Sequence, residues 1–219
     1  TGFIMSKKYD SNFLNYIISD FQKGNKDNAF IKLEKYIKEY PNDLIGQYNF
    51  AYIAQQMGKE DIAIKNYKIV IKKDPSNWRS RNNLYLIYFH KKNYDESLKL
   101  VNSVLKIKPD YQPALRDKAH ILFHQNKLDI ALDIITQSIK LNPKDYIAIN
   151  VLGMIHSGMR NYEIAKEIYL KAIKINKEYH PSYSNLAKCL IELNEREKAI
   201  EYLDICLKIN PKFIEGINN

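Results

Sequence analysis

The sequence predicts an all-α protein, a solenoid of stacked units that each contain two helices and a turn. The first observation is a spacing, because prolines recur every 34 residues at positions 41, 75, 109 and 143. A further proline at position 211 lies two periods beyond the fourth. The second observation is that apolar residues inside a period recur at helical spacing, as at Phe50, Ala51 and Ala54. A fixed period of this length is typical of solenoid repeats.

Taken in order, the period divides most of the chain into six units, which are 10–43, 44–77, 78–111, 112–145, 146–179 and 180–213. Residues 1–9 form an N-terminal extension, and residues 1–4, which precede Met5, are interpreted as an addition to the native sequence. Residues 214–219 start a seventh unit, so we expect the chain to be part of a longer protein. Each inter-unit proline should stop the preceding helix, because it cannot continue one.

Small and large side chains alternate where the two helices of a unit should approach most closely. The small residues are Ala29, Ala63, Ser97, Ala131, Ala165 and Ala199. Four positions later stand larger apolar residues, Leu33, Tyr67, Val101, Ile135, Tyr169 and Leu203. We expect both sets to be buried between the helices.

The turn inside a unit needs a residue that tolerates left-handed backbone. Four units supply one, with Gly24, Gly58, Asn126 and Asn194. Lys92 and Arg160 stand at the same place in the other two units, where we expect mild strain or a shifted turn.

Charged residues follow the same period. The first turn of every second helix carries an acid, Asp27, Asp61, Asp95, Asp129, Glu163 or Glu197. Its last turn carries a lysine, Lys38, Lys72, Lys106, Lys140, Lys174 or Lys208. Both signs complement the helix dipole, so we interpret these residues as stabilising helix ends rather than as a binding ridge.

Composition excludes some functions. The chain is 45% hydrophobic and 27% charged, with a net charge of +9. An anionic partner would suit this charge, but only five basic residues are arginine, and the sequence argues against nucleic acid. No apolar run is long enough to span a membrane, and no signal peptide is visible. Cys189 and Cys206 do not form a metal or disulfide pattern, so we expect a cytoplasmic protein without cofactors.

The order of Gly, Ala, aromatic residue and Pro in residues 44–77 resembles the tetratricopeptide repeat (TPR), whose unit has 34 residues. The resemblance covers 10–213 and implies a right-handed superhelix in which first helices line a concave groove and second helices form the outer face. It implies a protein–protein interaction scaffold that binds an extended peptide or protein segment in the groove. An alternative is the substrate-recognition array of a larger enzyme, similar to glycosyltransferases or sulfotransferases. No catalytic motif is present, so the chain itself is predicted not to be an enzyme.

The groove of this family implies a set of binding residues. The sixth place of a unit carries Asn15, Asn49, Asn83 and Asn185, and the series is interrupted by Asp117 and Val151. An amide both donates and accepts, so these residues either bind a peptide backbone or bond within the stack of helices. Predicted apolar groove residues are Tyr48, Tyr52, Leu86, Phe89, Phe123 and Met154, although part of this set could belong to the core. Predicted positive residues are Arg79, Arg116, His90, His120 and His124.

Two further expectations concern metal and self-association. Asp117, His120 and His124 share one helical face, and zinc accepts such ligands. The HExxH pattern of zinc proteases is absent, so we predict no metal site. Whether the face formed by Asp117, His120 and His124 can bind a metal ion cannot be decided from the sequence. The unfinished seventh unit predicts end-to-end self-association through apolar side chains of the sixth unit, Leu203, Leu207 and Ile209.

Overall fold

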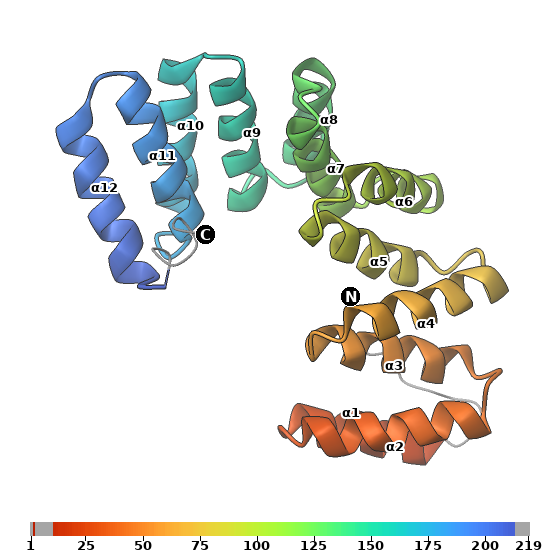
Figure 1. Ribbon diagram of the computed structural model, residues 1–219. Helices are drawn as coiled ribbons and strands as arrows, with labels where there is room; N and C mark the ends of the chain where they lie inside the picture. Colours follow the sequence, from red (N-terminus) through yellow and green to blue (C-terminus); the bar gives the residue numbers. More distant parts are fainter. Residues whose placement is uncertain (1, 3–10, 213–219) are drawn as a thin grey trace. The chain divides into compact units, whose positions relative to one another are not determined.

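The computed structural model describes residue 2 and residues 11–212, and every regular element in this part of the chain is a helix (Figure 1). Helices come in pairs. The first helices of the pairs are α1 (Ser11–Gln22), α3 (Leu44–Gln56), α5 (Trp78–His90), α7 (Gln112–His124), α9 (Tyr146–Gly158) and α11 (His180–Glu192). The second helices are α2 (Lys26–Glu39), α4 (Glu60–Lys73), α6 (Tyr94–Ile107), α8 (Leu128–Leu141), α10 (Tyr162–Ile175) and α12 (Arg196–Ile209). The predicted all-α solenoid is confirmed.

Contacts divide the chain into two compact units, which we call unit 1 (Thr1–Pro109, with α1–α6) and unit 2 (Asp110–Asn219, with α7–α12). In each unit the two helices of a pair pack against each other. Neighbouring pairs pack where the second helix of one pair meets the first helix of the next, as α2 meets α3 and α8 meets α9. First helices also touch one another, α1 with α3 in unit 1, and α9 with both α7 and α11 in unit 2. The first helices therefore share one face of each unit, which we call the first-helix face.

The predicted small and large residues form the core between paired helices. All six small residues are at most 1% exposed. Of the larger residues, five are at most 2% exposed, whereas Leu203 in α12 is only half-buried. The hydroxyl of Ser97, the one polar member of the small set, donates to the backbone carbonyl of Tyr85 at 2.9 Å. A buried hydroxyl is therefore satisfied where the other pairs have alanine.

The turns inside all six pairs place one residue in the left-handed region. Their φ angles are +99° at Gly24, +71° at Gly58, 59° at Lys92, 58° at Asn126, 61° at Arg160 and 60° at Asn194. The expectation of a shifted turn is therefore wrong, and the expectation of strain applies instead. A left-handed residue with a Cβ atom costs roughly 1–2 kcal/mol, so Lys92 and Arg160 are held there by the packing of their helices.

Exchanges at two of these turns should change stability in opposite directions. Lys92→Gly should raise the free energy of unfolding by about 0.5–1 kcal/mol, because glycine removes the strain but adds freedom to the unfolded chain. Gly58→Ala should lower it by about 1 kcal/mol, although a Cβ atom there would meet no atom within 4 Å. Urea unfolding of both variants tests this. A loss of stability in Lys92→Gly equal to that in Gly58→Ala would show that Lys92 is not strained.

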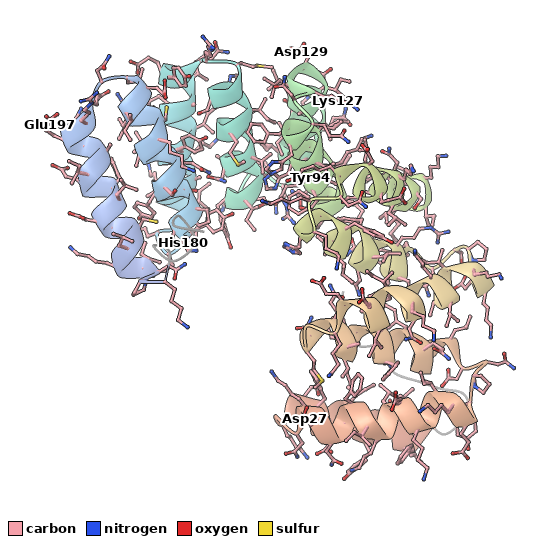
Figure 2. All side chains as sticks on the ribbon, in the orientation of Figure 1. Asp27, Tyr94, Lys127, Asp129, His180 and Glu197 are labelled. Atoms are coloured by element: carbon pink, nitrogen blue, oxygen red, sulfur yellow. The ribbon has the colours of Figure 1, made fainter. Side chains whose placement is uncertain are left out.

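Charged helix ends agree with the sequence prediction. Each predicted acid lies in the first turn of a second helix and each predicted lysine in its last turn. Figure 2 labels three of the acids, Asp27, Asp129 and Glu197, at the start of α2, α8 and α12. Three first helices also have side-chain caps, in which Asp43, Asn77 and Asp145 accept from backbone N–H groups.

The described residues contain no helix that is both long enough and apolar enough to cross a bilayer. Both cysteines are buried free thiols. In α12, Leu203, Leu207 and Ile209 are half-buried, whereas Ile200 and Ile205 are exposed. Residues 214–219, on which the expected self-association depends, lie outside the described part of the chain, so that expectation stays a prediction.

Candidate functional site

The first helices of unit 2 line a cavity of about 450 Å³, which we call the unit 2 cavity. Four predicted site residues meet in it, from all three first helices of the unit: Phe123, His124, Met154 and Asn185. Its apolar lining also includes Tyr162 and Tyr169 of α10. Its polar lining also includes Ser157, Lys188 and Glu192. The cavity therefore combines an aromatic interior with amide, ammonium and carboxylate groups at its border.

A second cavity, of about 610 Å³, lies on unit 1 between α1 and α3, and we call it the unit 1 cavity. Two predicted site residues, Asn15 and Tyr52, line it together with the backbone of Gly2. Its other lining residues include Ile18, Ser19, Phe21, Gln22 and Gln56. The amide oxygen of Asn15 is buried and accepts no hydrogen bond from the described residues.

The amide of Asn83 is buried beneath the first-helix face rather than exposed on it. Its Nδ2 donates to the hydroxyl of Tyr48 at 3.1 Å and to the hydroxyl of Tyr67 at 3.0 Å. Tyr67 donates in turn to Oε1 of Gln55 at 2.8 Å, and Tyr48 to the carbonyl oxygen of Gly2 at 2.9 Å. Burial raises the pKa of Tyr67 far above its usual value, so its hydroxyl stays a neutral donor.

Burial of the side chains corrects three sequence predictions. Asn83 is 3% exposed, and both Tyr48 and Asn49 are 0% exposed, so none of them presents its side chain to solvent. Asn83 donates both of its hydrogen bonds within the protein. Of the two roles that the sequence left open for it, bonding within the stack of helices is therefore the observed one. Truncating Asn83 would therefore affect the packing of unit 1 before it affected any ligand.

Asparagines of unit 2 are also bonded to one another. Nδ2 of Asn185 donates to Oδ1 of Asn150 at 3.2 Å, and the hydroxyl of Ser182 donates to the same oxygen at 3.1 Å. Asn150 is 3% exposed, whereas Asn185 is half-buried and lines the unit 2 cavity. Asn185 is thus held in place by a buried neighbour while part of its amide reaches the cavity.

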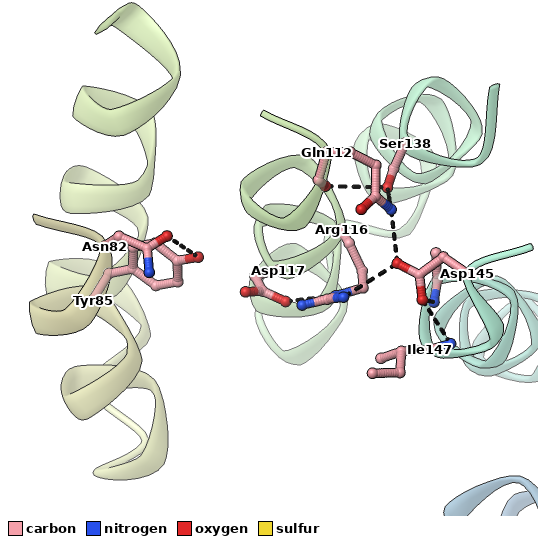
Figure 3. Close-up of polar contacts among 9 residues, drawn as sticks. Asn82, Tyr85, Gln112, Arg116, Asp117, Ser138, Asp145 and Ile147 are labelled. Atoms are coloured by element: carbon pink, nitrogen blue, oxygen red, sulfur yellow. Dashed lines mark hydrogen bonds and ion pairs between the residues drawn. The ribbon is translucent and has the colours of Figure 1, made fainter. Parts of the chain in front are cut away.

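Arg116 belongs to a largely buried charge cluster in unit 2, not to an open positive surface (Figure 3). Its Nε donates to Asp117 at 2.9 Å and its guanidinium NH1 nitrogen to Asp145 at 3.2 Å. Gln112 also donates to Asp145, at 2.7 Å. Only 19% of the Arg116 side chain and 8% of the Asp145 side chain are exposed. The sequence prediction that Arg116 faces a groove is therefore corrected to a structural role.

The cluster shifts the pKa values of Arg116 and Asp145. Burial opposes the charge of Arg116, but the carboxylates of Asp117 and Asp145 raise its pKa above the usual value. Burial likewise opposes ionisation of Asp145. Hydrogen bonds from Gln112 and the backbone of Ala148, together with Arg116, nevertheless hold its pKa below the ordinary 3.8. Arg116 and Asp145 are therefore both charged at neutral pH.

His120 and His124 lie one turn apart on α7, with their Nε2 atoms 3.2 Å from each other. The ring centroids are 4.8 Å apart. Burial, together with the nearby charges of His124 and Arg116, lowers the pKa of His120 to about 4. His124 is exposed and reaches the unit 2 cavity. Among the described residues, no three His, Cys, Asp or Glu side chains form a group that could hold a metal ion.

The remaining predicted residues lie in unit 1. Arg79 is exposed and its guanidinium stacks on the ring of Trp78 at 4.9 Å. Leu86 and Phe89 are half-buried, and Phe89 packs edge-on against His90 and Tyr94 at 5.9 and 5.8 Å. None of these residues lines either cavity described above.

Sequence reasoning missed Lys188 and Glu192 in unit 2 and Gln56 in unit 1, yet the repeat itself carries the signal for them. Lys188 stands at the position of Tyr52, Leu86, His120 and Met154 in earlier repeats, since each is 34 residues from the next. Glu192 and Gln56 occupy the position of His90 and His124. Extending both series along the chain would have identified all three.

Comparison with known proteins gives family matches and similar solved structures. Family models described as tetratricopeptide repeat match residues 13–43, 48–111, 147–179 and 180–213. Residues 112–146 lie outside these matches, but α7 and α8 keep the lengths and spacing of the other pairs, so we infer a repeat of the same kind. No curated protein sequence matches the chain.

Solved structures share the fold at low sequence identity. A tetratricopeptide repeat protein from Parabacteroides merdae has a TM-score of 0.79 at 16% identity, covering 88% of this chain and 77% of that chain. Pseudomonas aeruginosa pilF gives 0.72 at 17% identity, covering 91% of each chain. YrrB, described as a TPR protein with an unusual peptide-binding site, has a TM-score of 0.61 at 20% identity, covering 85% of this chain and 96% of that chain. The paired helices, their 34-residue spacing and these matches agree: the chain belongs to the tetratricopeptide repeat family.

Proposed function

We propose that the chain is an interaction module that binds an extended segment of another protein on the first-helix face. The observation that carries this proposal is the unit 2 cavity, to which three successive first helices contribute side chains. Its volume of about 450 Å³ is in the range of ligand pockets, roughly 300–1,000 Å³. A surface of this kind follows from the repeat, because each first helix presents the same positions to the same side.

The lining of the unit 2 cavity defines the chemistry of its ligand. Phe123, Met154 and Tyr162 are half-buried and offer apolar contact to an aliphatic or aromatic side chain. Lys188 and Glu192 are exposed at the border, one helical turn apart, and offer one charge of each sign. An apolar anchor flanked by polar groups suits this arrangement, since anchors in apolar pockets contribute most of the energy of many interfaces.

Unit 1 supports the same proposal through backbone recognition. The hydroxyl of Tyr48 donates to the carbonyl oxygen of Gly2, a residue that lines the unit 1 cavity. The same cavity contains the buried amide oxygen of Asn15, which accepts no bond from the described residues. The bond from Tyr48 to Gly2 is a contact between unit 1 and a stretch of polypeptide backbone, which is the type of group that the proposed ligand offers. The description of YrrB as a peptide-binding TPR protein agrees with this type of ligand.

Substitutions on the two sides of unit 2 test this proposal. Peptides selected from a display library against the whole chain would be titrated into each variant. Phe123→Ala should weaken binding by about 2 kcal/mol, or roughly thirtyfold, because it removes apolar contact from the cavity. Lys140→Ala, in the last turn of α8, removes an exposed charge and should leave the affinity within about twofold.

The reverse result would contradict the proposal. If Lys140→Ala weakened binding and Phe123→Ala did not, the lysines of the second helices would be the binding surface. Circular dichroism and urea unfolding of Phe123→Ala separate loss of binding from loss of folding, because a folded variant that does not bind has lost the site alone.

A further inference from the structure

The start of α5 combines residue types that are typical of binding surfaces. It carries Trp78, the single tryptophan of the chain, followed by Arg79 and Arg81, which are two of its five arginines. Tryptophan and arginine are enriched among the residues that contribute most of the energy at protein interfaces. Trp78 is half-buried and Arg79 is exposed. The composition of this turn therefore differs from that of a surface that only keeps the protein in solution.

Two cations lie against the ring of Trp78. The guanidinium carbon of Arg79 is 4.9 Å from the ring centroid, and Nζ of Lys108, which directly follows α6, is 4.8 Å from it. Both of these side chains are exposed. Because both charges lie this close to one ring, they are at most about 10 Å apart, a distance over which physiological salt does not fully screen them. The two charges therefore repel each other.

Neither charge is neutralised by the described residues. Arg79 and Lys108 have no ion pair and no side-chain hydrogen bond within this part of the chain. An acid in the loop before α5 acts elsewhere, since the pKa of Asp74 is lowered by hydrogen bonds from Ser76 and by the charge of Arg81. The surroundings of the Trp78 ring thus keep an excess of positive charge, which favours an anion.

Stability of the repeat does not account for Arg79. It lies in the first turn of α5, where the helix dipole disfavours a positive charge. The equivalent places in other repeats carry Ser11, Ile45, Pro113, Ile147 and Pro181. The dipole does favour Lys108 at the end of α6, but its equivalents are not basic: Tyr40, Asp74, Asn142, Asn176 and Asn210. Both cations are therefore particular to the third repeat.

We propose that Trp78, Arg79 and Lys108, which we call the Trp78 patch, bind an acidic segment of a partner protein. A guanidinium binds a carboxylate through two parallel hydrogen bonds, and the lysine adds a second positive charge for a neighbouring acid. The indole ring offers contact to an apolar side chain between the acids. Nucleic acid suits the patch less well, because its binding relies on neutralising many phosphates.

The inference rests on the proposed function for the class of partner, an extended protein segment. It places the contact on unit 1 and uses none of the residues that line the unit 2 cavity. The two proposals can therefore fail separately.

Fluorescence of the single tryptophan tests the Trp78 patch in the whole chain. The probe is a short synthetic peptide in which glutamates flank one leucine, and its neutral control has glutamine in place of glutamate. We expect the acidic peptide to change the emission of Trp78 with saturation, and to lose affinity as salt is added. The neutral peptide should bind at least about tenfold more weakly, because it lacks the charge-assisted bonds.

Arg79→Gln and Lys108→Gln should each weaken binding of the acidic peptide by roughly five- to tenfold, since each removes one charge-assisted contact. Lys106→Gln is the matched control, because Lys106 is exposed in the last turn of α6, two residues from Lys108. It should keep the affinity within about twofold. All three substitutions are at exposed positions, and circular dichroism checks that each variant is folded.

Phe123→Ala separates the two proposals, because it alters the unit 2 cavity and should leave binding of the acidic peptide unchanged. If the acidic peptide does not bind, or binds the combined Arg79→Gln and Lys108→Gln variant as tightly as the unchanged chain, the Trp78 patch is not its site and the inference is overturned. An oligonucleotide that binds more tightly than the peptide and is lost in the same variants would also overturn it, by assigning the patch to phosphate.

Discussion

Arg116→Met should lower the free energy of unfolding by about 3 kcal/mol, because removing one partner of a buried ion pair leaves the other uncompensated. Asp145 would keep its bonds from Gln112 at 2.7 Å and from the backbone of Ile147 at 2.9 Å. These bonds place the expected loss at the lower end of the range for buried pairs. Urea unfolding followed by circular dichroism measures it.

Lys99→Met is the matched control, because Lys99 forms an exposed pair with Glu96 and such pairs contribute at most about 1 kcal/mol. Acid gives a second readout of the same cluster. Since the pKa of Asp145 is lowered by folding, its contribution is present above the ordinary value of 3.8 and is lost as pH falls through the lower folded value. A loss in Arg116→Met no larger than that in Lys99→Met would contradict the structural role of Arg116.

Tyr169→Ala should cost about 3–5 kcal/mol, because it removes a large side chain from the core between α9 and α10. Tyr169 is 2% exposed, and its hydroxyl lies 3.3 Å from that of Ser157. The ring packs against Gly153, where an added Cβ atom would lie 2.5 Å from Cε1 of Tyr169. Thermal unfolding of the variant measures the loss, and Tyr202→Ala on the half-buried side of α12 should cost less.

Combining the two positions should reverse the sign of one substitution. Gly153→Ala alone should cost about 1–3 kcal/mol through overpacking, in spite of the better helix propensity of alanine. In the Tyr169→Ala background the clash is gone, and the same change should stabilise by up to about 1 kcal/mol. Additive effects in this double-mutant cycle would mean that the two residues are not in contact.

Most of the fold could be predicted from the sequence, because the repeat makes each local signal appear several times. A single small residue on a helix says little, but Ala63 and its five equivalents at one spacing identify a close approach between helices. Left-handed turns could be predicted only in part. Lys92 and Arg160 do not have the residue type that such turns prefer, and the packing of the flanking helices imposes the conformation on them.

The candidate site was harder to predict, because burial depends on contacts that cross from one repeat to the next. Asn83 and Tyr48 occupy positions that the repeat assigns to the first-helix face. In the structure both side chains are buried, and they are hydrogen-bonded to each other. Arg116 was predicted as a positive groove residue, and one of the two acids that bind it, Asp145, is 29 residues away in the sequence. Phe123 and Met154 both line the unit 2 cavity, and their assignment to a binding surface stays a prediction.

Mapping a bound peptide by nuclear magnetic resonance tests the proposed binding surface most directly. A peptide selected by display would be added to the ¹⁵N-labelled chain, and amide shifts would be followed to saturation. We expect the largest changes in α7, α9 and α11 around Phe123, Met154 and Asn185. Small changes are expected at the exposed ends of α8 and α10, including Lys140 and Lys174. Shifts concentrated at those lysines, with the unit 2 cavity unaffected, would contradict binding on the first-helix face.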